Sequence, residues 1–186
     1  MFEDEVEMPT ELLNEEGKLF ENCKQCGAGL QNPPKPYTLE KVYKRYPNTD
    51  KPQVLFEYAV CDDCSEEIRE EFSKESMQNM QMYFLEHLAD RTAEIEEQSL
   101  KEKLGQCLLK NTPLNEEQEY AIVARANGSK LLKSYYPFAI GVTAMDELQE
   151  LLSEQTRDLL DDFVNRNFTG PPEFETVPVD GKWVLV

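Results

Sequence analysis

Two pairs of cysteines in the first third of the sequence are the residues best suited to chemistry. Cys23 and Cys26 form one C-x-x-C pair, and Cys61 and Cys64 form a second. The C-x-x-C spacing brings two thiolates onto one ion, and two such pairs complete the four-sulfur tetrahedron that Zn²⁺ prefers in structural sites. Gly27 follows the first pair and lets backbone amides approach the sulfurs. The spacing therefore predicts one structural Zn²⁺ held by all four cysteines.

Two other interpretations of these cysteines stay open. Rubredoxin-like iron sites use similar pairs, but a glycine normally follows each pair, and here Ser65 follows Cys64. This difference favours zinc without proving it. The cysteines could also be two redox-active or buried pairs that bind no metal. The glycines after the first pair and the helix start at the second pair would then be coincidences.

The segment between the two cysteine pairs is expected to form a β-hairpin. Residues 37–46 and 52–60 are rich in β-branched and aromatic side chains, and the sequence PNTDKP between them is dense in turn-forming residues. The second strand runs directly into CDDC, where Asp62 and Asp63 suit the N-terminus of a helix. The second cysteine pair is therefore predicted to lie where a strand becomes a helix.

This order of elements resembles the treble-clef group of zinc fingers over about residues 20–75. CKQCG is similar to the knuckle of that group, and VCDDCSEEIREEF is similar to its strand-to-helix ligand pair. The resemblance implies zinc bound by Cys23, Cys26, Cys61 and Cys64 as a folding element without an open catalytic position. We recognise no family in the rest of the chain.

Beyond the second cysteine pair the pattern is helical. Apolar residues spaced three or four positions apart predict one long helix from Glu66 to about Gln98 and a second helix over residues 100–109. The stretch MQMYFLEHL within the long helix is apolar on nearly all sides, which suggests that other elements or a second chain cover it. A homo-oligomer formed through this helix is therefore one expectation.

The C-terminal part is predicted to contain hairpins and helices. Asn127 and Gly128 lie between two apolar runs and form a short-range signal for a β-hairpin. Thr143 and Ser153 are suited to cap two further helices, the second reaching Phe168. An Asp-Gly pair in the tail FETVPVDGKWVLV favours a terminal hairpin or an edge strand. The sequence shows no internal repeat of useful length.

These elements together predict an α+β fold in three parts. Residues 1–20 form an acidic leader with a weak helical pattern, residues 21–75 form the zinc-finger module, and residues 76–186 form a helical and β-hairpin body. The body is continuous with the finger helix. In this interpretation a treble-clef-like finger of knuckle, β-hairpin and helix leads into the long helix and then into a C-terminal unit of helix and antiparallel hairpin.

The charge of the molecule disfavours polyanions as partners. The formal net charge is −18 at pH 7, which repels phosphate backbones and anionic membranes. The predicted hairpin is an exception, because Lys41, Lys44 and Arg45 alternate there with tyrosines in the mixture that suits nucleic acids. An RNA- or DNA-binding finger that uses these three residues is therefore the alternative function. A solvated strand pair with inward-packed aromatics is the simpler explanation.

Catalytic interpretations find little support in the sequence. Treble-clef nucleases and zinc deaminases rely on histidine, and His87 is the only histidine of the chain. We expect His87 to pack on the long helix and Cys107 to be a small buried residue. Met77, Met80 and Met82 are expected to belong to the helix core, with an adaptable interaction face as the alternative. The sequence thus predicts a non-enzymatic protein.

The leading hypothesis is a protein-interaction or adaptor module with an unidentified protein partner. Residues 1–20 carry acidic side chains where a secretory signal needs a basic start and an unbroken apolar stretch, so a cytoplasmic location is expected. No apolar run approaches the length of a transmembrane helix, and no membrane partner is expected.

Overall fold

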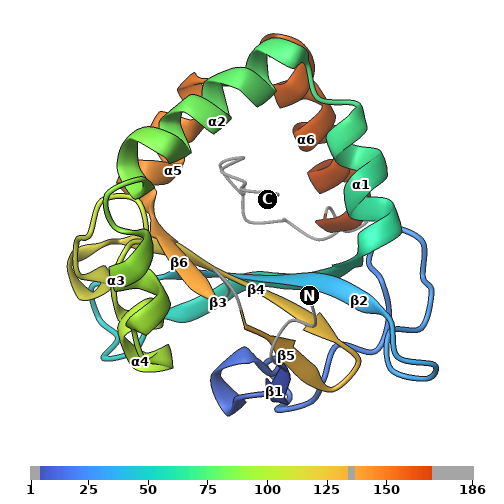
Figure 1. Ribbon diagram of the computed structural model, residues 1–186. Helices are drawn as coiled ribbons and strands as arrows, with labels where there is room; N and C mark the ends of the chain where they lie inside the picture. Colours follow the sequence, from blue (N-terminus) through green and yellow to red (C-terminus); the bar gives the residue numbers. More distant parts are fainter. Residues whose placement is uncertain (1–4, 134–136, 169–186) are drawn as a thin grey trace.

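An antiparallel sheet with an arch of helices over one face forms the centre of the molecule (Figure 1). The computed structural model describes residues 5–133 and 137–168. Within these residues the sheet has six strands, in the order β1-β5-β4-β2-β3 with β6 also paired to β4. The strands are β1 (Glu5–Glu7), β2 (Pro36–Lys44), β3 (Gln53–Cys61), β4 (Glu119–Asn127), β5 (Lys130–Leu132) and β6 (Phe138–Gly141).

Six α-helices occur in the same part of the chain. They are α1 (Asp62–Glu70), α2 (Lys74–Leu88), α3 (Thr92–Glu97), α4 (Leu100–Gly105), α5 (Val142–Glu150) and α6 (Glu154–Phe168). Short 3-10 helices occur at η1 (Thr10–Leu12) and η2 (Leu114–Glu116). The mixture of helices and antiparallel strands confirms the α+β class. Among the helices described here, none has the length and apolar character needed to span a membrane.

Both predicted hairpins with described residues are present. β2 and β3 pair antiparallel with Leu39 opposite Ala59, and β4 pairs with β5 across the turn at Asn127 and Gly128. Gly128 has φ +54°, and a Cβ there would lie 2.7 Å from the Cβ of Pro34, so the turn requires glycine. The predicted terminal hairpin in FETVPVDGKWVLV lies outside the described residues.

The predicted long helix is wrong, because three helices occupy its range. α1 ends before Phe72, and Ser73 begins α2 by accepting a hydrogen bond on its Oγ from the amide of Ser76 at 3.1 Å. A short polar side chain of this kind favours a cap over a helix interior. A second break precedes α3, where Arg91 has φ −117° and ψ 0°. The chain therefore folds back over the sheet as the arch of Figure 1.

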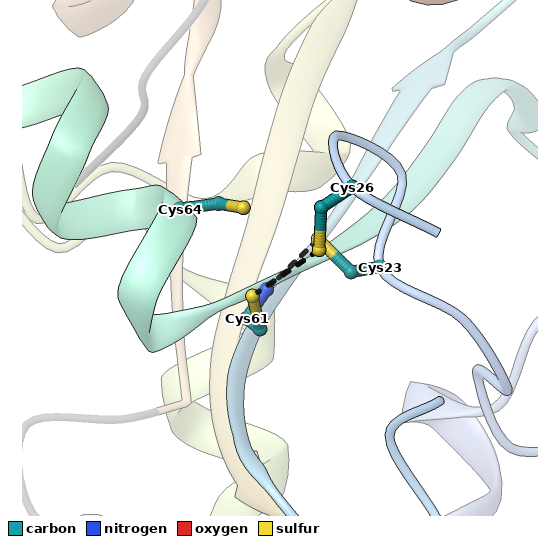
Figure 2. Close-up of side chains that lie close together, drawn as sticks. All are labelled: Cys23, Cys26, Cys61 and Cys64. Carbon is teal, nitrogen blue, oxygen red and sulfur yellow. Dashed lines mark hydrogen bonds between the residues drawn. The ribbon is translucent and has the colours of Figure 1, made fainter. Parts of the chain in front are cut away.

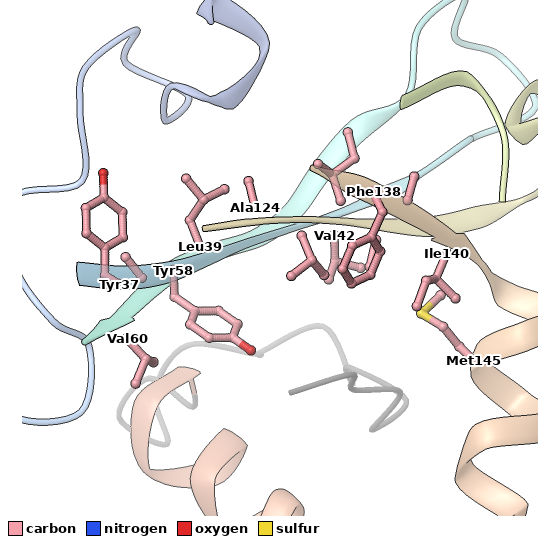
Figure 3. Packing of buried hydrophobic residues seen from close by; sticks show 14 of the residues in the cluster. Tyr37, Leu39, Val42, Tyr58, Val60, Ala124, Phe138, Ile140 and Met145 are labelled. Atoms are coloured by element: carbon pink, nitrogen blue, oxygen red, sulfur yellow. The ribbon is translucent and has the colours of Figure 1, made fainter. Parts of the chain in front are cut away.

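The core lies on both faces of the sheet (Figure 3). Tyr58 and Ile140 lie on the side that faces the helices, where Met145 of α5 packs, and Tyr37 and Leu39 lie on the opposite side. All five side chains are buried. Burying an apolar side chain of this size contributes about 1.5–3 kcal/mol to folding, so the sheet is stabilised from two sides.

The acidic leader is tied to the sheet. β1 pairs with β5, with Val6 opposite Leu131, and this strand was not predicted. The helical pattern of residues 10–20 gives only η1, but Leu12 and Phe20 of the same segment are buried. The leader covers the face of the sheet away from the helices, where Lys41 donates a hydrogen bond to the carbonyl of Leu13.

Strands from the predicted finger and the predicted body lie side by side in one sheet. β2 pairs with β4 along its whole length, from Pro36 opposite Asn127 to Lys44 opposite Glu119. The finger hairpin therefore shares a hydrogen-bonded ladder with residues more than 70 positions further along the chain.

Candidate metal centre

The second cysteine pair lies where a strand becomes a helix, as predicted. Cys61 is the last residue of β3 and the N-cap of α1, with extended backbone at φ −65° and ψ 155°. Cys64 lies in the first turn of α1. The helix N-terminus carries a partial positive charge, which favours thiolate at both positions.

The first cysteine pair lies in a tight turn, the knuckle, defined here as residues 23–28. The amide of Cys23 donates to the carbonyl of Ala28, and the amide of Gly27 donates to the carbonyl of Cys23, both at 2.8 Å. Gly27 has φ +73°, which is the left-handed region that glycine adopts without strain. The amide of Lys24 donates to the carbonyl of Ala59 at 2.8 Å and fixes the knuckle beside β3.

The four sulfur atoms converge on one point between the knuckle and the start of α1 (Figure 2). All four Sγ atoms lie within 4.8 Å of one another, and those of Cys26 and Cys61 are 3.8 Å apart. A zinc tetrahedron with Zn–S distances of about 2.3 Å requires sulfurs about 3.8 Å apart, so modest closure would complete the site. Cys23, Cys61 and Cys64 are buried, and Cys26 is exposed.

Backbone amides and burial act in opposite directions on these thiols. Burial raises the pKa of Cys23, but hydrogen bonds from the amides of Cys26, Cys61 and Gln25 outweigh it and lower that pKa. Burial first, and then the neighbouring sulfurs, raise the pKa values of Cys61 and Cys64. Four thiolates together would be strongly repulsive, and a divalent cation among them would remove that cost.

The arrangement is that of a closed ligand set. Within the described residues, these four cysteines are the one cluster of metal-ligating side chains. His87 lies elsewhere on α2, where its Nδ1 donates to the carbonyl of Tyr83 at 2.8 Å and its ring packs 4.1 Å from that of Tyr83. A tetrahedron filled by four sulfurs leaves no position for water or substrate on the metal.

The basic residues of the hairpin are engaged inside the protein. Lys41 is 4% exposed and forms an ion pair with Glu57 at 3.3 Å. Lys44 pairs with Glu119 at 2.5 Å, and the guanidinium of Arg45 lies 5.8 Å from the ring centre of Tyr120. A phosphate would have to displace these partners, and nucleic-acid contact through Lys41, Lys44 and Arg45 stays a prediction.

The other residues considered for chemistry have varied positions. Cys107 is buried, as expected. Met80 packs against the core, but Met77 and Met82 are 41% and 69% exposed, so the expectation that all three methionines are helix core is wrong for these two. Leu85 is also exposed, at 56%, and the side of α2 that contacts α5 carries the polar contacts of Tyr83.

Two features of the centre were missed in the sequence. The amide of Cys61 donates to the sulfur of Cys23 at 3.3 Å, and Arg125 of β4 forms an ion pair with Asp62 at 2.5 Å. Both contacts depend on which strands are neighbours, and no local pattern carries that information.

Comparisons of the chain with family models, with curated proteins and with solved structures find no match.

Proposed function

We propose that this protein is a zinc protein in which Cys23, Cys26, Cys61 and Cys64 hold one structural Zn²⁺. The observation that carries the proposal is the convergence of four sulfurs within 4.8 Å from a knuckle and a strand-to-helix junction. The order of knuckle, hairpin and helix is that of a treble-clef finger. Four thiolates favour zinc over the oxygen-preferring cations.

The role proposed for the ion is to hold the finger together. Two hydrogen bonds, donated by the amides of Lys24 and Cys61, connect the knuckle to β3. Two such bonds are a weak restraint against the repulsion of four thiolates. Metal binding contributes on the order of 10 kcal/mol to folding in small zinc peptides, far more than two hydrogen bonds supply.

We further propose a non-enzymatic role as a protein-interaction module. A closed four-sulfur shell supplies rigidity instead of a reactive metal-bound water. Met82 and Leu85 lie one turn apart on the outer side of α2 and are more than half exposed. Exposed apolar side chains of this kind suit a protein partner better than a polyanion.

Elemental analysis of the purified protein tests the metal. Wild-type protein is expected to contain one zinc per chain, and Cys23→Ser is expected to lose it. Cys107→Ser is the matched control, because Cys107 is also buried but stands apart from the four-cysteine cluster, and it should keep its zinc.

Three outcomes would contradict the proposal. Iron in place of zinc would favour electron transfer, and zinc that is lost equally from both variants would point to a general effect of unfolding. Protein that is folded and free of metal would remove the basis of the finger.

A further inference from the structure

The two helix pairs of the arch have identical bounds 80 positions apart. The first pair is α1 (Asp62–Glu70) and α2 (Lys74–Leu88), and the second is α5 (Val142–Glu150) and α6 (Glu154–Phe168). The C-cap residues of α1 and α5 also match, with φ −80° and ψ −12° at Glu71 and φ −80° and ψ −14° at Leu151. The starts of both helices and the end of the first helix match in the two pairs, as do the cap angles, and this agreement indicates that the two pairs are related.

The strands before these helices follow the same relation. β3 pairs with β2, with Ala59 opposite Leu39, and β6 pairs with β4, with Ala139 opposite Ile122. β4 (Glu119–Asn127) is thus the counterpart of β2 (Pro36–Lys44), shifted by 83 positions. In the antiparallel pairing of β2 with β4, Glu40 lies opposite Val123, its own counterpart. A two-fold pseudo-symmetry axis therefore passes through the centre of the sheet.

A second knuckle lies beside β6. The amide of Cys107 donates to the carbonyl of Thr112 at 2.8 Å, and the amide of Asn111 donates to that of Cys107 at 2.8 Å. These bonds repeat those of the first knuckle, 84 positions later, and Asn111 has φ 55° where Gly27 has φ 73°. The amide of Leu108 reaches the carbonyl of Ala139 at 2.7 Å, as that of Lys24 reaches Ala59.

Within the arch, the two-fold pseudo-symmetry axis passes through a cluster of four hydroxyl groups. The amide of Ser73 donates to Oγ1 of Thr156 at 3.0 Å, and the amide of Ser153 donates to Oγ of Ser76 at 2.8 Å. Between them, the hydroxyl groups of Ser73 and Ser153 are 2.8 Å apart. Ser76 and Thr156 are fully buried. The same contact is made in both directions, as a two-fold axis requires.

Each knuckle is also covered from the opposite side of the axis, by the end of a helix or by the segment that follows it. At the end of α6, Phe168 lies under the ammonium of Lys24, and Asn167 donates to Gln25 at 3.4 Å. Just beyond α2, Arg91 donates to the carbonyl of Leu108 at 2.9 Å. The two halves are thus interleaved.

We propose that the chain is an internal duplication and that residues 106–168, the ion-pair half, are a metal-free copy of residues 22–88, the cysteine half. The counterparts of Cys23, Cys26, Cys61 and Cys64 are Cys107, Lys110, Gly141 and Ala144. One ligand is kept, and three are replaced. The proposal rests on the proposed function for the zinc in the cysteine half, but the equivalence of the two frames does not depend on it.

Side chains of opposite charge join the second knuckle to α5 in the ion-pair half. Lys110 forms an ion pair with Glu147 at 2.5 Å, and Tyr83 donates to the same carboxylate at 2.6 Å. A Cβ built on Gly141 would lie 2.6 Å from the carboxylate carbon of Glu117, so this acid fills the position of the third ligand. Lys110 therefore links the second knuckle to α5, as zinc would link the first knuckle to α1.

Rebuilding the second metal site tests the duplication. The fourfold variant K110C/E117A/G141C/A144C restores three thiols and makes room for the side chain at position 141. It is expected to bind one more Zn²⁺ per chain than the wild type, and Co²⁺ should give the visible bands of a second tetrahedral thiolate site. Adding Cys107→Ser should remove the extra ion, because Cys107 would be its fourth ligand.

The number of ions that the variant binds beyond those of the wild type tests the duplication. The metal content of the wild type itself tests the proposed function. A wild type without metal and a variant with one ion would contradict the proposed function and support the duplication. A folded variant that gains no ion, or an extra ion that persists after Cys107→Ser, would overturn the duplication.

A milder variant covers the case in which the fourfold variant does not fold. K110C/A144C leaves Gly141 and Glu117 in place and offers three sulfurs with the carboxylate of Glu117. It is expected to take up one extra Cd²⁺. No extra ion, or failure of this variant to fold as well, would also overturn the proposal, because equivalent frames must both accept thiols at these positions.

Discussion

The cysteine half and the ion-pair half hold the same backbone frame with different chemistry. Both fix a knuckle to the second of two paired strands through one amide, two positions before the strand-to-helix junction. In one half four sulfurs converge on a point, and in the other Lys110 and Glu147 form an ion pair, to which Tyr83 of the cysteine half donates a hydrogen bond. The comparison indicates that backbone hydrogen bonds define the shape of the knuckle. The side chains determine whether a metal is needed to hold it.

The largest difference between the halves is expected on loss of the metal. Cys61→Ser should lower the free energy of unfolding by several kcal/mol, because the metal-binding free energy of a structural site is folding free energy. A strong chelator should destabilise the wild type to a similar extent. Urea unfolding followed by circular dichroism measures both effects.

Cys107→Ser sharpens this test, because it removes the corresponding sulfur of the ion-pair half. The variant should lose only the stability expected for a buried polar substitution and should stay as sensitive to chelator as the wild type. Wild-type protein whose urea midpoint does not move with chelator would contradict the difference between the halves.

The two serines on the axis should behave alike. Ser73→Ala and Ser153→Ala each remove an N-cap and one side of the buried hydroxyl cluster, so each should cost about 1–2 kcal/mol. The double variant should cost less than the sum, because the two hydroxyl groups contact each other. Urea unfolding of the three variants measures the coupling.

Ser99→Ala is the control for these caps. Ser99 begins α4 with an exposed capping box away from the axis, so its loss should cost about 0.5–1 kcal/mol. Strictly additive effects of Ser73→Ala and Ser153→Ala would argue against contact across the axis.

The ion pair of Lys110 and Glu147 should contribute less than a cap and should depend on pH. Hydrogen bonds from Lys110 and then from Tyr83 lower the pKa of the Glu147 carboxyl. A carboxyl group whose pKa is lowered by folding stabilises the fold at pH values above its ordinary pKa of about 4.3. This contribution is lost as the pH falls through the lowered pKa. Lys110→Met should therefore cost less than about 1 kcal/mol at pH 7 and nothing in strong acid.

Urea midpoints at several pH values between 7 and 3 measure this loss. Arg166→Met is the control, because Arg166 and Asp162 form a largely exposed pair on α6 and should have no measurable effect. A cost of Lys110→Met that does not change with pH would show that the contribution of Lys110 is packing instead of charge.

The smallest effect on stability is expected on the outer side of α2. Met82→Gln and Leu85→Gln should change the free energy of unfolding by no more than about 0.5 kcal/mol, because both side chains are more than half exposed. If α2 carries the proposed interface, the same pair should abolish self-association or partner binding. Light scattering after size exclusion measures self-association, and an oligomer that survives both substitutions would exclude α2 as its interface.

Local patterns in the sequence predicted the cysteine cluster, both described hairpins and the cap at Ser153. These features depend on residues close together in the chain, such as the C-x-x-C pairs and the Asn127-Gly128 turn. Thr143 was predicted to cap α5, but Gly141 takes that position because the helix starts directly from β6. The predicted long helix failed at Ser73, whose partners Ser153 and Thr156 lie about 80 positions away.

The duplication could not be read from the sequence for a physical reason. Between residues 61–88 and 141–168, identical residues occur only at Glu67 and Glu147, Glu70 and Glu150, and Ser73 and Ser153. The halves otherwise share only the spacing of apolar side chains, which any amphipathic helix pair would show. The ligand cysteines that would mark a repeat are replaced by Lys110, Gly141 and Ala144.

X-ray absorption at the zinc edge of the purified protein tests the central claim most directly. We predict a single shell of four sulfurs at about 2.3 Å from zinc, with no nitrogen or oxygen neighbour. The shell should lose one sulfur in Cys26→Ser, whose side chain is the most exposed of the four. A shell with fewer than four sulfurs in the wild type, or with nitrogen or oxygen ligands, would contradict a closed structural site formed by Cys23, Cys26, Cys61 and Cys64.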